Sequence, residues 1–155
     1  MRVPDHRDEL GPPNIKLGGL ELWVHGRECP GDPLPWDADW LNVTAYCVAP
    51  GARVWVSGPV LSSTSFARWS AECEVLCTKL SGRAELHSYE PNLRVLLECS
   101  GSTNGIVLAV FLTPDHLRQE HRFEWELDES YLPQLLDDVR AIVHSYPVPA
   151  GLTAL

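Results

Sequence analysis

The sequence predicts an α+β fold in which an antiparallel-dominated sheet of about seven strands is packed against two helices. Three observations lead to this prediction. Several short segments alternate between apolar and polar residues, which is the pattern of strands with one buried face. Two longer segments repeat apolar residues every three or four positions, which is the pattern of amphipathic helices. Loops of hairpin length separate most of the strands, and such loops connect antiparallel neighbours.

Three strands are expected before the first helix, at residues 20–25, 41–48 and 52–57. The second of them alternates without interruption, so its inward-facing set is expected to be Leu41, Val43, Ala45 and Cys47. Pro50 and Gly51 form a turn signal after this strand. The second and third strands are therefore expected to be the two arms of one hairpin.

A helix is expected at residues 64–80, where the spacing of apolar residues changes to three and four. Its apolar stripe consists of Phe66, Trp69, Cys73, Leu76, Cys77 and Leu80. Serine and threonine side chains cap helix N-termini well, so residues 62–65 provide several candidate caps. Gly82 follows the stripe and is the candidate glycine at the C-terminal end.

Four strands and a closing helix are expected in the rest of the chain. The strands are placed at residues 83–89, 93–99, 105–112 and 120–127, with a hairpin loop at residues 101–105. The helix is placed at residues 131–145, where Pro133 fits only in the first turn. Its apolar stripe consists of Leu132, Leu135, Leu136, Val139, Ile142, Val143 and Tyr146. The predicted order is β-β-β-α-β-β-β-β-α, which contains no βαβ nucleotide-binding unit.

A single domain is expected to hold these elements. The chain has 155 residues, 45% of them hydrophobic and six of them tryptophan, which is typical of one packed domain. Residues 1–17 contain prolines and mixed charges without periodicity, so a flexible N-terminal arm is expected there. Residues 18–147 form the expected domain, and residues 148–155 form the expected C-terminal tail.

The chain is strongly acidic, with 21 Asp and Glu side chains against 12 Lys and Arg, a net charge of −9. Nucleic-acid binding requires clustered basic side chains, and the sequence contains no basic stripe. We therefore expect no direct contact with nucleic acid. An acidic surface favours either plain solubility or a basic protein partner, because complementary charge accelerates association.

We expect the protein to reside in the cytoplasm. The N-terminal residues contain no apolar segment of the kind that secretory signals have. The longest apolar run, residues 106–112, is far shorter than the ~20 residues of a membrane-spanning helix, so no membrane contact is expected. The five cysteines are an odd number and are scattered, which indicates reduced thiols rather than a disulfide framework.

No catalytic, cofactor or metal site is expected. Cys73 and Cys77 lie four residues apart on the first helix, but zinc needs four ligands and both cysteines belong to the apolar stripe. Burial as small hydrophobic residues explains them better. His116 and His121 have no matching second pair of ligands. The sequence also lacks a Gly-x-Ser-x-Gly nucleophile elbow, a phosphate loop and a dinucleotide-binding fingerprint.

Two polar segments stand out beside strand ends. Residues 36–41 place two tryptophans around two aspartates, which predicts a turn whose carboxylates accept local backbone hydrogen bonds while the indoles pack. Residues 90–93 begin with Glu-Pro-Asn, which suits a tight turn between two strands. Both segments are expected to build corners of the sheet. They also supply the candidate binding residues, which are Trp36, Asp37, Asp39, Trp40, Glu90 and Asn92.

Three marks occur in order along the chain. They are Trp36-Asp37-Ala38-Asp39-Trp40-Leu41, then Glu90-Pro91-Asn92-Leu93, then the closing amphipathic helix that ends in Tyr146-Pro147. In this order and spacing, over residues 18–147, the sequence resembles the WapI family of bacterial immunity proteins. Such proteins are encoded beside contact-dependent polymorphic toxins and protect the producing cell. Asp39 departs from the family pattern, in which asparagine is more frequent.

The resemblance implies a non-enzymatic inhibitor whose partner is one cognate toxin domain. Toxins of these systems are often nucleases with basic substrate grooves, and an acidic binder can occlude such a groove. Two other classes stay open at this point. A small-molecule enzyme would show a deep pocket with perturbed titratable groups. An assembly or structural module would show a large self-complementary apolar interface.

Overall fold

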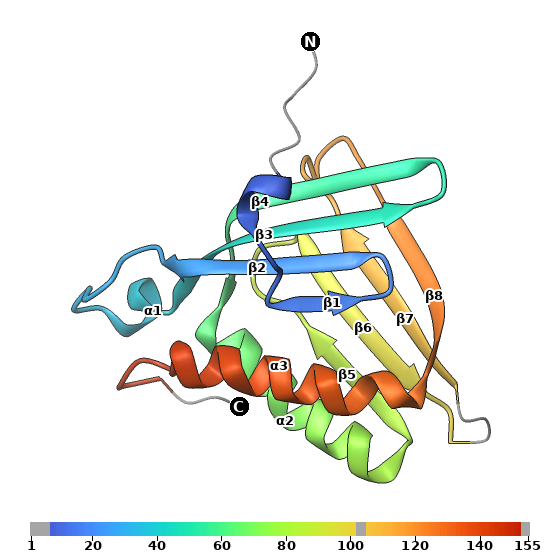
Figure 1. The fold of residues 1–155 in the computed structure, drawn as a ribbon. Helices are drawn as coiled ribbons and strands as arrows, with labels where there is room; N and C mark the ends of the chain where they lie inside the picture. Colours follow the sequence, from blue (N-terminus) through green and yellow to red (C-terminus); the bar gives the residue numbers. More distant parts are fainter. Residues whose placement is uncertain (1–6, 102–104, 153–155) are drawn as a thin grey trace.

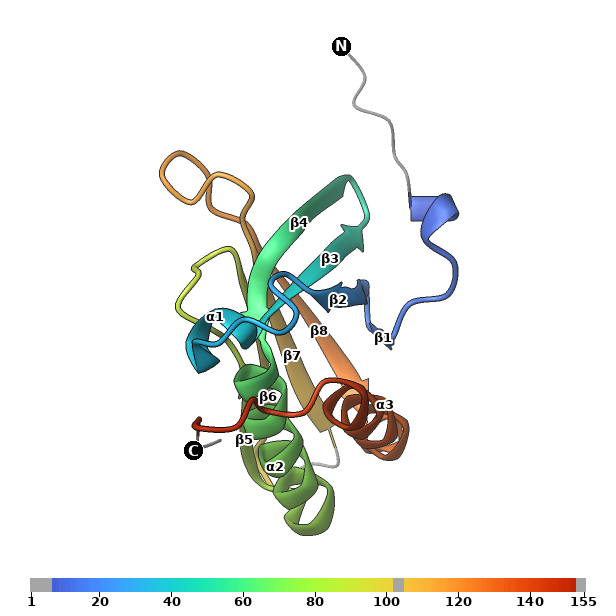
Figure 2. The ribbon, with the colours of Figure 1, turned by 90° about the vertical axis from the view of Figure 1, so that its left-hand side faces the viewer.

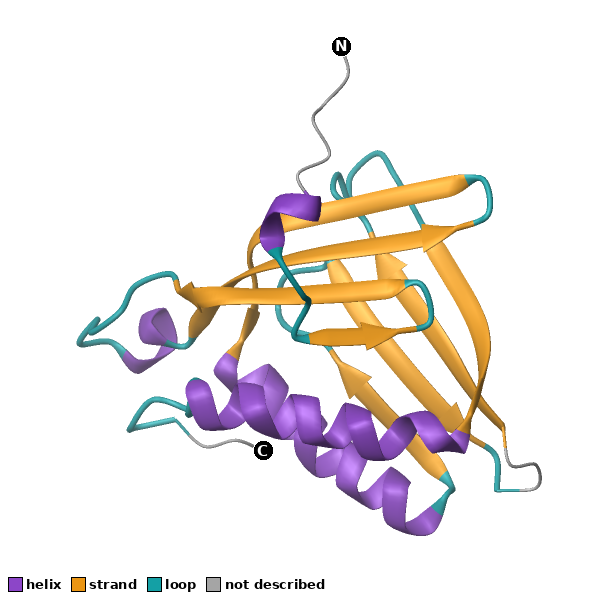
Figure 3. Cartoon of the chain, in the orientation of Figure 1, coloured by secondary structure: helices purple, strands orange, loops and turns teal. Residues whose placement is uncertain are grey.

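The computed structural model of the chain describes residues 7–101 and 105–152, and it confirms the predicted α+β class. Within these residues eight strands form two antiparallel sheets of four strands each. Figure 1 shows the strands of the first sheet running across the view and those of the second running diagonally behind them. Figure 3 shows the two long helices together below the strands. Residues 1–6, 102–104 and 153–155, which include parts of the expected arm, hairpin loop and tail, lie outside the described residues.

The first sheet consists, in spatial order, of β1 (Ile15–Leu17), β2 (Leu20–Arg27), β3 (Trp40–Ala49) and β4 (Ala52–Ser62). The hairpin predicted at Pro50 and Gly51 joins β3 to β4. The predicted inward-facing set of β3 is confirmed, because each of its four members is fully buried: Leu41, Val43, Ala45 and Cys47.

The outer face of the first sheet carries a row of aromatic side chains. Trp23 packs edge-on against Tyr46 with ring centroids 5.9 Å apart, and Tyr46 stacks on Trp55 at 5.6 Å. Trp23 Nε1 donates a hydrogen bond to Gly11 O (3.0 Å), which holds the segment before β1 against the sheet. Trp23 and Tyr46 are therefore buried, although the alternating pattern placed them opposite the core.

The second sheet consists, in spatial order, of β5 (Gly82–Leu86), β6 (Leu93–Cys99), β7 (Gly105–Leu112) and β8 (Arg122–Asp128). The bounds of β6 and β7 agree with the sequence prediction residue for residue. β5 ends three residues earlier than predicted, and the segment that follows it turns away from the sheet.

Two sheets form where the sequence predicted one, and the reason is the position of the first long helix. α2 (Ser63–Lys79) follows β4 directly and carries the chain away from the first sheet, so β5 begins a new sheet and pairs with β6. Each sheet directs an apolar face toward the core. These two faces can cover each other only if the strands form two separate layers rather than one sheet. One continuous core contains residues of both sheets and both helices.

β1 lies inside residues 1–17, where the sequence predicted a flexible arm. Its three residues pair with β2, and Ile15 and Leu17 are 1% and 2% exposed. A three-residue strand is too short to show a period, and its burial depends on a neighbour that the sequence does not identify.

The long helices close the core on one side. α2 and α3 (Leu132–Ser145) pack against each other, and Figure 2 shows them side by side below the strands. The expected leading residues of both stripes, Trp69, Leu76, Leu135 and Ile142, are at most 3% exposed, which confirms the predicted faces. Three short helical elements complete the described residues: a 3₁₀ helix at Arg7–Leu10, α1 (Pro35–Ala38) between β2 and β3, and a 3₁₀ helix at Glu129–Tyr131 directly before α3.

The ends of α2 confirm one expected cap and correct the other. The side chain of Ser62 accepts a hydrogen bond from Ser65 N (3.1 Å), as the serine-rich stretch predicted. At the other end Leu80 caps the helix in the left-handed conformation (φ 52°), and its N–H bonds to Leu76 O; Gly82 also has a positive φ (101°) but lies beyond the cap. Gly82 instead opens β5, and Leu80 O accepts a hydrogen bond from the thiol of Cys99.

A glycine turn between β1 and β2 brings the two sheets into contact. A Cβ atom on Gly19 would lie 2.1 Å from Val48 O and 2.5 Å from the indole ring of Trp125 on β8. Contacts this short do not occur in folded proteins, so the first sheet approaches Trp125 this closely only because residue 19 has no side chain.

Gly19→Ala is expected to destabilise the fold by at least about 3 kcal/mol, because both neighbours are fixed in strands and must move. Thermal unfolding of the purified variant measures this loss. Gly31→Ala is the control, since a Cβ there meets nothing within 4 Å and adds only the strain of a positive φ. Equal melting temperatures for the two variants would contradict the close approach at Gly19.

All five cysteines are free thiols. Burial raises the pKa of Cys47 to about 12, and burial, with the charges of Cys77 and Glu72, raises that of Cys73 to about 12. Thiolate is the reactive form, so these two side chains are protected both by the core and by protonation.

A thiol-reactive chromophore added at pH 8 without reductant is therefore expected to leave Cys47 and Cys73 unmodified in the native protein. Unfolding in denaturant exposes every thiol, and the count should then rise to five. A final count of three or fewer would show a disulfide, and fast native labelling of Cys73 would contradict its burial on the inner face of α2.

None of the helices in residues 7–101 and 105–152 has the length and apolar character needed to cross a membrane.

Candidate functional site

The first turn of α2 is held by a residue from a distant part of the chain. Asp39 Oδ1 accepts a hydrogen bond from Thr64 N (3.1 Å), and Asp39 O accepts one from Ser63 N (2.9 Å). Free backbone N–H groups at a helix start need such acceptors, and a carboxylate also suits the positive end of the helix dipole. Together with Ser62, Asp39 therefore caps α2.

Arg27, at the end of β2, connects the same helix start to two other segments. Its Nη1 atom donates to Ala38 O in α1 (2.8 Å) and to Ser63 Oγ in α2 (3.1 Å). Its Nη2 atom donates to Pro147 O, just after α3. One guanidinium thus ties the end of β2, α1, the start of α2 and the segment after α3 together. Figure 2 shows that segment crossing in front of α2.

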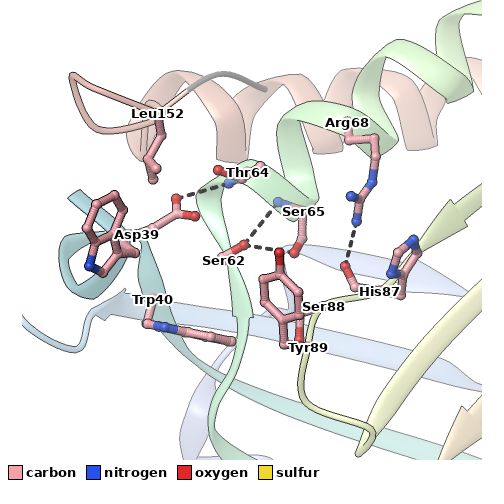
Figure 4. A pocket seen from close by; sticks show the side chains of 11 residues that line it. Asp39, Trp40, Ser62, Thr64, Ser65, Arg68, His87, Ser88, Tyr89 and Leu152 are labelled. Carbon is pink, nitrogen blue, oxygen red and sulfur yellow. Dashed lines mark hydrogen bonds between the residues drawn. The ribbon is translucent and has the colours of Figure 1, made fainter. Parts of the chain in front are cut away.

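A pocket of about 450 Å³ lies beside this junction. α1, the start of α2, and the segment between β5 and β6 contribute its walls, and Figure 4 shows it from close by. The lining residues are Trp36, Asp39, Trp40, Ser62, Thr64, Ser65, Arg68, His87, Ser88, Tyr89 and Leu152.

Aromatic side chains and one carboxylate dominate one part of the pocket. Trp36 is 59% exposed, Tyr89 is 98% exposed and Trp40 is half-buried, so each of the three aromatic lining residues is at least partly open to solvent. Asp39 as a residue is 7% exposed, and Figure 4 places its carboxylate on the side of Trp40 and Leu152.

The opposite part of the pocket is basic. Arg68 Nη2 donates a hydrogen bond to His87 O (2.9 Å), which fixes the guanidinium beside the segment that leaves β5. Figure 4 shows Arg68 and His87 on the side away from Asp39, with Ser65 and Tyr89 between the two ends. Charge is therefore separated along the pocket.

The second predicted segment is attached to the fold mainly through Asn92. Asn92 Nδ2 donates to Thr113 O (2.9 Å) and Pro114 O (3.3 Å), and Asn92 O accepts from Thr113 N. Ser88 Oγ donates to Val60 O (2.6 Å) and accepts from Glu90 N (3.1 Å). These bonds leave the side chains of Tyr89 and Glu90 pointing into solvent.

The structure brings only some of the predicted binding residues together. Trp36, Asp39 and Trp40 line the first pocket, whereas Glu90 lines a neighbouring hollow of about 480 Å³. Both hollows share His87 and Ser88. The side chains of the other two candidates line neither of them: Asp37 and Asn92.

The expected role of residues 36–41 needs a correction. The sequence predicted local hydrogen bonds to the carboxylates and packed indoles. In the structure Asp39 bonds to a helix 25 residues away, because the β3–β4 hairpin returns the chain to its start, and Trp36 is exposed. The sequence did not predict four residues that bond at this junction or line the pocket: Arg27, Arg68, Tyr89 and Leu152. Of these, only Tyr89 had a signal in the sequence, because it directly precedes the candidate residue Glu90.

Metal-binding geometry is not found in the described part of the chain. No three or more His, Cys, Asp or Glu side chains there are grouped so that they could hold an ion.

Asp39→Ala is expected to destabilise the protein by about 1–2 kcal/mol, because it leaves the buried Thr64 N–H without an acceptor. Asp39→Asn keeps an oxygen at the same position and is expected to lose less than half as much. Denaturant unfolding of both variants measures the difference. If the two variants lost the same stability, the charge rather than the hydrogen bond would hold the helix.

Residues 13–147 match the family model described as the immunity protein WapI-like family, which covers the three marks, both sheets and both long helices. A comparison with curated proteins found no match. The match to the family model extends over far more than half of the chain and agrees with the resemblance carried by the motifs. The chain therefore belongs to the WapI-like family of immunity proteins.

Proposed function

We propose that this protein binds one cognate bacterial toxin domain and neutralises it without catalysing a reaction. Membership of the WapI-like immunity family is the observation that carries this proposal. The partner is a protein, not a nucleic acid or a membrane, and the protein acts in the cytoplasm of the cell that it protects.

The charge of the chain supports a basic partner. A net charge of −9 attracts a positively charged domain and accelerates encounter. A nuclease is the toxin class that fits best, because its substrate groove must be basic to bind phosphates. The acidic protein would then occupy the groove in place of nucleic acid.

The proposed contact surface surrounds the pocket beside α2. Its exposed side chains come from the two motif segments: Trp36 and Asp37 from α1, and Tyr89 and Glu90 from the turn before β6. Exposed aromatic residues beside acidic groups are good anchors, because the rings bury a large area with little loss of side-chain entropy. Asp39 and Asn92 support this surface through their hydrogen bonds to the backbone.

Co-expression tests the proposed function. Cells that produce the toxin domain encoded next to this protein are expected to survive only when this protein is also produced. The purified pair is expected to associate more slowly as salt rises, since exposed charges are screened within about 10 Å at 0.1 M ionic strength. Equal killing with and without the protein would refute the proposal.

Alanine substitution of the two exposed rings tests the proposed surface. Trp36→Ala combined with Tyr89→Ala should weaken toxin binding by at least tenfold and leave the melting temperature unchanged, because both rings are exposed. Tyr131→Ala is the matched control, since Tyr131 is 50% exposed and lies at the other end of α3 from Pro147. Unchanged affinity in the double variant would place the contact surface elsewhere.

A further inference from the structure

We infer that the pocket beside α2 receives a cationic side chain, an arginine or a lysine, of the partner protein. The inference rests on the proposed function for the identity of the partner, but its chemistry is derived from the pocket alone. The carboxylate of Asp39 and three aromatic side chains form the receiving end.

The carboxylate of Asp39 has room for a second partner. Its Oδ1 atom accepts from Thr64 N, and none of the described residues donates a hydrogen bond to Oδ2. A carboxylate can accept about four hydrogen bonds, and Asp39 is largely buried as a residue, while its Oδ2 is not among the buried atoms that lack a partner in the described part of the chain. A buried charge of this kind is stabilised by an opposite charge, and an incoming ammonium or guanidinium group supplies one.

The aromatic walls favour the same occupant. Trp36, Trp40 and Tyr89 line the pocket, and the face of an aromatic ring attracts a cation because its π electrons carry negative charge. The same faces repel an anion. A planar guanidinium can also stack on a ring while its N–H groups reach a carboxylate, so arginine is expected to bind more tightly than lysine.

The basic part of the pocket lies on the side away from Asp39. The guanidinium of Arg68 is anchored on His87 O and lies at the other end, beyond Tyr89 and Ser65. The helix start is not an open anion site either, because Asp39 and Ser62 already accept from its N–H groups. Further acidic side chains lie close to Cys29: desolvation, and after it the charges of Glu28, Asp32 and Asp37, raise the pKa of that thiol.

The pocket has the size for such a group. Its volume of about 450 Å³ is within the range of small-molecule sites and exceeds what one side chain fills. The ring of Tyr89 stands fully exposed at this pocket, so it can fold over an inserted side chain at little cost.

A titration of the free protein tests the inference without any toxin. The probes are N-acetyl-arginine amide, the neutral N-acetyl-citrulline amide and acetate, and the readout is the NMR shift of the Trp36 and Trp40 indole N–H signals. The arginine amide should shift both signals at millimolar concentration, and Asp39→Asn should abolish the shift while the citrulline amide gives none. Shifts caused equally by citrulline amide, or by acetate acting on the Arg68 end, would overturn the inference.

A second experiment uses the intact complex. Asp39→Asn keeps the acceptor for Thr64 N and removes one charge, and it should weaken toxin binding at least tenfold without a matching fall in melting temperature. Asp137→Asn makes the same chemical change on the exposed surface of α3 and should alter affinity less than twofold.

The toxin side supplies the final comparison. Alanine substitution of each Lys and Arg on the toxin should reveal one cation whose loss makes binding insensitive to Asp39→Asn. If the wild-type protein binds and protects but no toxin cation couples to Asp39, the inference fails and the immunity function stands. If the wild-type protein neither binds nor protects, the proposed function fails as well.

Discussion

The hydrogen bonds around the first turn of α2 are the constraint on which the arrangement of this protein depends. Asp39 and Arg27 meet there, and between them they hold the end of β2, α1, the start of α2 and Pro147 shortly after α3. These segments are far apart in sequence. Because Asp39 caps α2 from elsewhere in the chain, this part of the helix's stabilisation is present only when the residues before β3 are in place, which couples α2 to the first sheet.

This junction also explains how one short motif can serve stability and recognition together. Asp39 lies on the buried side of the motif and bonds to backbone, whereas Trp36 lies on the exposed side beside the pocket. The second motif repeats the division, since Asn92 bonds to the end of β7 and Tyr89 and Glu90 extend into solvent. In each segment a polar side chain fixes the backbone by hydrogen bonds. The fixed backbone then holds the exposed side chains of the same segment in position for a partner.

The electrostatics of the chain act at two ranges. At long range the net charge of −9 favours approach of any basic protein, and salt weakens this effect. At short range a single carboxylate in an aromatic pocket can select one cation by distance and direction. The first effect raises the rate of encounter, and the second slows dissociation, so the two together suit an inhibitor that must reach its target quickly and stay bound.

The sequence by itself determined the elements that rest on local periodicity. β6, β7, both long helices, the serine cap of α2 and the first turn of α3 at Pro133 were predicted correctly, because each depends on residues a few positions apart. The family could also be identified, since the order of its short motifs is a property of the chain.

Only the tertiary structure decided which elements share a layer and which residues meet. The division into two sheets follows from where α2 directs the chain, and β1 is ordered by pairing with β2. Arg27, Arg68, Tyr89 and Leu152 join Asp39 around one helix start although up to 125 residues separate them. Hydrogen bonds and aromatic contacts between such distant segments leave no period in the sequence, so their partners become visible only when the backbone is folded.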